Sequence, residues 1–90
     1  MTYRSGNRTA TTTAAGLVSA VGTSVNRVLI QNRGAVNVLI GDSASQDYLL
    51  GPGESLPIVS EDSSNFDLST IYIKAESSTC VVGWNGHSLP

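Results

Sequence analysis

Short apolar runs separated by Gly, Asn, Asp and Ser make up the chain from residue 17 onward. This pattern is typical of β-strands joined by turns, and no stretch shows the 3.6-residue period of an amphipathic helix. It predicts strands at 17–21, 25–31, 36–40, 48–50, 55–59, 70–75 and 79–84. About seven short antiparallel strands at this spacing indicate an all-β fold, a small β-sandwich or barrel, with an extended N-terminal arm.

Alternation of apolar and polar positions predicts which side chains face the core, because successive residues of a strand point to opposite faces. The rows expected to face inward are Val28 and Ile30; Val36, Val38 and Ile40; Leu56 and Ile58; Ile71 and Ile73; and Cys80, Val82 and Trp84. The opposite faces keep Leu39, Val59, Tyr72 and Val81. The outer surface is therefore expected to be partly apolar and available for contacts.

Turn residues and repeated letters suggest how the strands connect. Asn32 and Gly34 favour a tight turn, and the similar segments 26–30 and 37–40 on either side of it predict an antiparallel hairpin. Pro57 cannot donate to a ladder, so its strand is expected at a sheet edge. The loop at 60–67 is polar except for Phe66, which is either a lid over the core or part of a contact loop.

Residues 1–15 read as an arm, because they contain small and β-branched residues and few large apolar ones. Fully extended, such a segment spans about 50 Å, which is enough to reach a neighbouring subunit. We predict an arm at 1–15 and a β-domain at 16–90. The alternative is a disordered terminus.

Composition and charge limit the range of functions. The 90 residues are 40% hydrophobic and 13% charged, with one cysteine and one histidine, so neither a disulfide nor a structural zinc site is expected, and oligomerisation is the remaining source of extra stability. All four arginines precede the first acidic residue, Asp42. An acidic body repels phosphates, so nucleic acid is not an expected partner. Residues 1–22 hold no apolar run that suits a membrane span or signal peptide, so secretion is not expected.

Catalytic chemistry is not indicated. His87 lies in the C-terminal tail, and the adjacent Glu61 and Asp62 lie in a polar loop, so neither pattern predicts an active site. No cofactor-binding or metal-binding motif is present, and none is expected. Tyr48 and Tyr72 could stack on sugar rings, whereas Trp84 is aligned with the core row of its strand.

Four segments, VLIQN, NVLIGD, LLGPGESLPI and FDLSTIYIKAESSTCVVGW, resemble small virion proteins of tailed bacteriophages, above all capsid decoration (cement) proteins. The resemblance covers about two thirds of the chain, and its motifs mark turns and core. It implies binding to the outside of the capsid, as a dimer or trimer that clamps neighbouring subunits. The implied partners are the major capsid protein and other copies of this chain. The implied location is the virion surface, after synthesis in the host cytoplasm.

The residues expected to bind a partner lie in the arm and in the longest loop. They are Tyr3, Arg4, Arg8, Thr11, Thr13 and Phe66. The alternative function is a tail or fibre module that binds a receptor or glycan, in which Tyr48, Tyr72 and Phe66 would line an exposed site.

Overall fold

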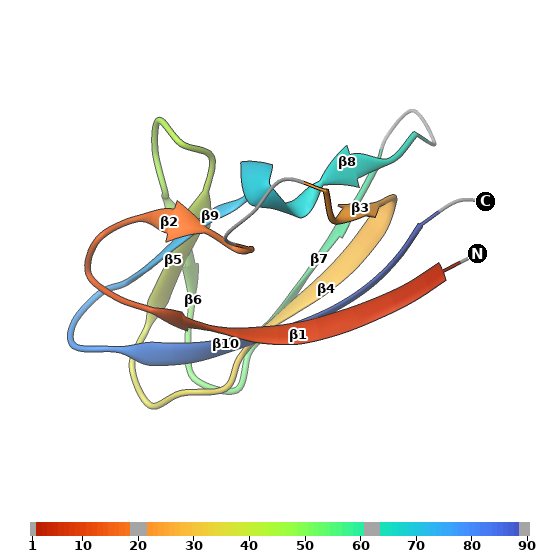
Figure 1. The fold of residues 1–90 in the computed structure, drawn as a ribbon. Helices are drawn as coiled ribbons and strands as arrows, with labels where there is room; N and C mark the ends of the chain where they lie inside the picture. Colours follow the sequence, from red (N-terminus) through yellow and green to blue (C-terminus); the bar gives the residue numbers. More distant parts are fainter. Residues whose placement is uncertain (1, 19–21, 61–63, 89–90) are drawn as a thin grey trace.

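The structure is a computed structural model that describes residues 2–18, 22–60 and 64–88 (Figure 1). Within these residues the secondary structure is β-strand with one short 3₁₀ helix, η1 (Leu68–Thr70). The strands are β1 (Thr2–Ala10), β2 (Ala15–Gly16), β3 (Ser24–Val25), β4 (Arg27–Asn32), β5 (Val38–Gly41), β6 (Tyr48–Leu50), β7 (Ser55–Val59), β8 (Phe66–Asp67), β9 (Tyr72–Ala75) and β10 (Cys80–Ser88). The prediction of an all-β fold is confirmed.

The strands form two four-stranded sheets and one short pair, and every ladder is antiparallel. The long sheet has the order β1-β10-β4-β7 and the short sheet has the order β2-β9-β5-β6. The third sheet has only two strands, β3 and β8. Figure 1 shows β1, β10 and β4 running side by side along the molecule, with β9, β5 and β6 at one end and the β3-β8 pair toward the other.

Strand alternation places one common apolar cluster between the sheets. In β4 exposed and buried residues alternate without a break, so Val28 and Ile30 are fully buried. Burying each such side chain contributes about 1.5 to 3 kcal/mol. The inward rows expected from the sequence belong to this cluster, although Val36, Leu56, Ile58 and Trp84 are only partly buried against it.

The predicted hairpin between the two similar segments is wrong. β4 pairs with β10 and β7, whereas β5 pairs with β9 and β6, so the chain crosses from one sheet to the other after Asn32. This crossing places the apolar rows of β4 and β5 on opposite sides of one core. If β4 and β5 had paired as a hairpin in one sheet, their apolar rows would lie side by side on the same face, and neither row would cover the other.

The predicted arm at 1–15 is also wrong. β1 pairs with β10 at nine positions, from Thr2 opposite Ser88 to Ala10 opposite Cys80. The predicted boundary between residues 15 and 16 falls inside β2, which pairs with β9. A segment of small and β-branched residues cannot build a core of its own, but an edge strand needs only a ladder partner and a few inward side chains such as Ala10.

The other strand predictions differ mainly at their ends. Strands 48–50 and 55–59 match β6 and β7, and Pro57 lies on an edge strand as expected. The strand predicted at 17–21 is wrong where it can be compared, since Leu17 is buried in a bend after β2, and 19–21 lie outside the described residues. Strand 70–75 begins later because η1 precedes it, and strand 79–84 continues to Ser88.

Asp67 caps η1, and this contact makes a testable contribution to stability. Its carboxylate accepts hydrogen bonds from the backbone N–H groups of Ser69 (2.9 Å) and Gly22 (2.7 Å), and these bonds lower the pKa of Asp67. A carboxyl group whose pKa is lowered by folding stabilises the protein above its unfolded pKa, and this contribution is lost as pH falls through the folded value. We expect Asp67→Asn to lower the free energy of unfolding at pH 7, because asparagine keeps an acceptor oxygen but loses the charge that strengthens both hydrogen bonds.

The measurement is the melting temperature of wild type and Asp67→Asn at a series of pH values from neutral to strongly acidic. The difference should be largest at neutral pH and shrink as the pH falls from about 4, where the unfolded chain begins to take up the proton, through the lowered pKa of Asp67 in the folded protein. A difference that stays constant across the whole range would show that the charge of Asp67 contributes nothing.

Candidate contact surface

The outward side of the long sheet carries exposed apolar side chains on all four of its strands. Tyr3 of β1 is 74% exposed, Val81 of β10 is 41%, Leu29 of β4 is 46% and Val59 of β7 is 49%. Single exposed apolar residues are ordinary on any protein, but four that share one face make that face the candidate contact surface. We call this side the outer face of the long sheet.

Charge differs between the two sheets, although Lys74 lies on β9 of the short sheet. The four strands of the long sheet contain Arg4, Arg8 and Arg27 and no carboxylate, and Arg33 follows directly after β4. The acidic residues Asp42, Asp47 and Glu76 lie in turns beside strands of the short sheet. Glu54, directly before β7, accepts a hydrogen bond from the N–H of Gly51. Arg27 lies on the outer face with the apolar side chains, whereas Arg4 and Arg8 alternate with Tyr3 and lie on the opposite side of the sheet.

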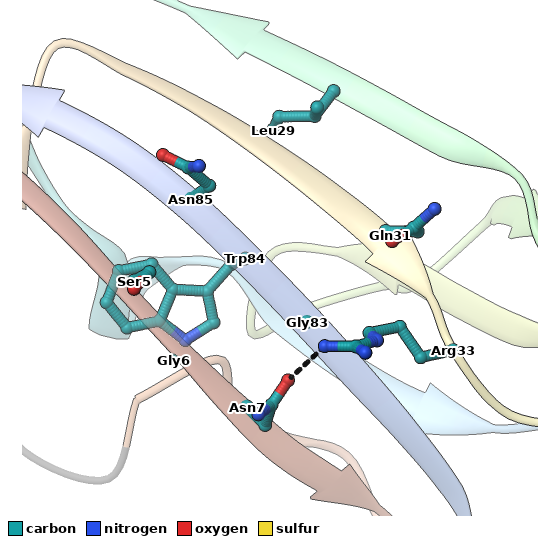
Figure 2. A pocket seen from close by; sticks show the side chains of 9 residues that line it. All are labelled: Ser5, Gly6, Asn7, Leu29, Gln31, Arg33, Gly83, Trp84 and Asn85. Carbon is teal, nitrogen blue, oxygen red and sulfur yellow. Dashed lines mark hydrogen bonds between the residues drawn. The ribbon is translucent and has the colours of Figure 1, made fainter.

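A shallow hollow of about 340 Å³ lies on the outer face (Figure 2). Figure 2 shows the guanidinium of Arg33 extending across Gly83 toward Asn7 of β1, and Arg33 Nη1 donates to Asn7 Oδ1 at 3.5 Å. A Cβ atom at Gly83 would lie 2.7 Å from Arg33 Cδ, so only glycine leaves room for this side chain. The hollow is lined by Ser5, Gly6, Asn7, Leu29, Gln31, Arg33, Gly83, Trp84 and Asn85.

Trp84 joins β10 to the edge strand β1. Gly6 lies directly opposite Trp84 in the ladder, and a Cβ atom at Gly6 would lie 2.9 Å from Trp84 Cζ2. The indole therefore covers the space that a side chain on β1 would fill. Trp84 is half-buried and packs against the core cluster, so its predicted core role holds only in part.

Three of the predicted partner-binding residues share one strand, although Tyr3 points to the opposite side from the two arginines. Tyr3, Arg4 and Arg8 all lie on β1. The Tyr3 ring meets the His87 ring edge to face, with centroids 5.7 Å apart. Arg4 is exposed and Arg8 is half-buried.

The remaining predicted residues lie elsewhere. Thr11 and Thr13 are exposed in the turn after β1, where the Thr11 hydroxyl donates to the Thr13 carbonyl oxygen at 3.3 Å. Phe66 lies on β8, is half-buried and packs against the core cluster. Phe66 therefore helps to cover the core and does not lie with Tyr3, Arg4 and Arg8 on β1.

The aromatic residues considered for glycan binding do not share one site. Tyr48 is 52% exposed on the edge strand β6, opposite the inward-facing Ile40. Tyr72 is half-buried on β9 and lies opposite Gly41, one position further along β5. Neighbouring positions of a strand face opposite sides, so the two tyrosines point to different sides of the short sheet.

Sequence reasoning missed most of the hollow. The alternation of β4 does place Leu29 and Gln31 on the outward face, because both alternate with buried residues. Asn85 lies beyond the predicted end of its strand at residue 84. Arg33 lies between Asn32 and Gly34 of the predicted turn, and only the tertiary structure shows that its side chain crosses β10 to reach β1.

The described residues offer little reactive chemistry. No three His, Cys, Asp or Glu side chains in the described ranges lie close enough to hold a metal ion, and no helix there is long and apolar enough to cross a membrane. Cys80 is a buried thiol that donates to Asn32 Oδ1 at 3.0 Å. Glu61 and Asp62 lie outside the described residues.

Comparisons of the chain with protein families, curated proteins and solved structures found no match.

Proposed function

We propose that this protein is a structural component of a tailed-phage virion that binds the outside of the capsid and bridges neighbouring capsid subunits. The supporting observation is the outer face of the long sheet, which exposes an apolar side chain on each of its four strands and has no carboxylate in those strands. Such a face suits a broad, flat protein contact rather than an enclosed ligand. The resemblance of the turn segments to decoration proteins supports the same role.

The size of this face favours bridging over a single strong contact. Four strands about 4.8 Å apart and about 23 Å long give an area of roughly 450 Å². A standard stable interface uses about 800 Å² on each partner. One face is therefore a modest contact, and attachment gains strength when an oligomer engages two or three subunits at once.

Deletion of residues 1–15 does not test this proposal, because β1 is part of the long sheet. Its removal would take away the ladder partner of β10 at nine positions and unmask Trp84. Loss of attachment after such a deletion would report unfolding as readily as a lost contact. Substitutions of outward side chains are the proper test.

The copy number of the protein in purified particles from its source tests the role directly. We expect on the order of hundreds of copies per particle, in simple ratio to the major capsid protein, because a shell offers many equivalent sites. Quantitative mass spectrometry against the shell subunit measures this ratio. Absence from the particles would contradict any role in the virion.

The second candidate is a tail or fibre module that binds a receptor or glycan. The hollow favours it, because the amides of Asn7, Gln31 and Asn85 and the guanidinium of Arg33 can bond to sugar hydroxyls. The same measurement separates the two candidates. A tail component would be present at a few to a few dozen copies, since a particle carries a single tail.

A further inference from the structure

β1 leaves one edge of the long sheet unpaired within the part of the chain that the structure describes. It is nine residues long, pairs only with β10 and ends the strand order of the sheet. The opposite edge strand, β7, is five residues long and contains Pro57. Long edge strands without proline are templates for strand addition, whereas proline, short length and charged side chains protect an edge against strands that do not match it. The two edges of this sheet therefore differ in their capacity to accept another strand.

The ladder pattern shows which backbone groups of β1 face outward from the edge. The N–H of Arg33 donates to the carbonyl of Val81 at 2.9 Å, so these two residues form a hydrogen-bonded pair between β4 and β10. Because bonding direction alternates along an antiparallel strand, the next positions of β10, Val82 and Trp84, bond to β1. In β1 the residues bonded to β10 are then Arg4, Gly6 and Arg8. The residues between them point their N–H and C=O groups to the free edge, namely Tyr3, Ser5, Asn7 and Thr9.

The side chains of this edge indicate the charge of a partner. Arg4 and Arg8 lie on the same side of β1, about 13 Å apart at about 3.3 Å per residue. In an added ladder both would occupy non-hydrogen-bonded positions, where side chains on neighbouring strands come closest. No strand of the long sheet contains a carboxylate. An incoming strand with two carboxylates four residues apart would place one beside each guanidinium.

A second copy of β1 fits this edge less well. Antiparallel pairing that uses all nine residues places Gly6 opposite Gly6 and Arg4 opposite Arg8. Like charges directly opposite each other destabilise a sheet. The charges therefore favour an acidic partner over self-pairing.

We propose that the free edge of β1 is a strand-addition site for an extended acidic segment of a partner protein. The main-chain groups of Tyr3, Ser5, Asn7 and Thr9 would supply the ladder, and Arg4 and Arg8 would select the acidic sequence. This site uses the edge rather than the outer face, so it goes beyond the proposed function and does not depend on the partner being a capsid subunit.

The test uses the full chain and two synthetic peptides, TVEVTVEVT and its lysine counterpart TVKVTVKVT, with binding measured by fluorescence anisotropy. We expect the acidic peptide to bind and Ser5→Pro to weaken it at least about tenfold, because proline removes an N–H that points to the free edge. Ser5→Ala is the matched control, since it loses the same side chain but keeps the N–H. The ladder to β10 does not use the Ser5 N–H, so circular dichroism and thermal melting should show both variants folded.

Charge reversal and hydrogen exchange provide independent readouts. Arg4→Glu with Arg8→Glu should lose the acidic peptide and gain the lysine peptide, and the amides of Ser5 and Asn7 should become protected from exchange when the acidic peptide binds. Equal binding by Ser5→Pro and Ser5→Ala, or no binding of the acidic peptide, would overturn the proposal. A wild-type dimer without peptide that Ser5→Pro converts to monomer would assign the edge to a second copy instead.

Discussion

Replacing Asn32 with leucine will lower the free energy of unfolding by about 3 kcal/mol or more, because buried polar groups lose their hydrogen-bond partners. The Asn32 side chain is fully buried at the end of β4. Its amide nitrogen donates to the carbonyl oxygens of Val36 (2.8 Å) and Leu50 (2.9 Å). Its oxygen accepts from the N–H of Gly34 (2.9 Å) and from the Cys80 thiol (3.0 Å).

This network lies where the chain passes from the long sheet to the short sheet. Asn32 belongs to β4 and Leu50 to β6, so one side chain connects the two sheets and also fixes the turn that begins at Arg33. A domain of this length has a total stability of roughly 5 to 13 kcal/mol, so the substitution removes a large share of it. Leucine has a similar size, and the loss therefore reports hydrogen bonds rather than a cavity.

Urea unfolding followed by circular dichroism measures the effect. Gln31→Leu is the control, because Gln31 is the neighbouring residue of β4 and its side chain is exposed. That change should alter the free energy of unfolding by about 0.5 kcal/mol or less. If Asn32→Leu and Gln31→Leu unfold at the same urea concentration, the network does not stabilise the junction between the sheets.

Leu29→Glu will weaken attachment to purified particles by about tenfold or more, because a charge replaces an apolar side chain near the centre of the proposed contact. Leu29 lies on β4, next to β10 and β7, and lines the hollow. Its side chain is 46% exposed, so the substitution should change the stability of the isolated protein only slightly.

Leu49→Glu is the matched control for this experiment. Leu49 is 51% exposed but lies on β6 of the short sheet, away from the outer face of the long sheet. Particles stripped of the protein are mixed with each variant, and the bound fraction is measured after sedimentation. Wild-type binding by Leu29→Glu would remove the outer face from the contact, and loss with Leu49→Glu alone would move the contact to the short sheet.

The candidate surface was only partly predictable from the sequence. Strand alternation predicted that Val59 and Val81 face outward, and both lie on the outer face of the long sheet. Tyr3, Arg4 and Arg8 were selected as parts of a free arm, and the structure instead places them on an edge strand. The hollow was not predicted, because it forms where β1, β10 and β4 lie side by side and combines residues far apart in the chain.

The sequence by itself determined the features that depend on local pattern. Alternation in single strands predicted the β class and the inward rows of Val28 with Ile30 and of Val38 with Ile40, because the two faces of a strand are set by the residues within it. Pro57 likewise predicted an edge, because a missing donor is a local property.

Only the tertiary structure decided which strands pair and what role each polar residue has. The segments 26–30 and 37–40 look alike, but their partners lie at 48–50, 55–59, 72–75 and 80–88. Asn32 looks like a turn residue, yet the crossing of the chain buries it between the sheets. β1 has too few apolar residues to predict a place in a core, and its position follows from the ladder that β10 offers. Ladder partners are chosen by contacts between distant segments, which no local pattern contains.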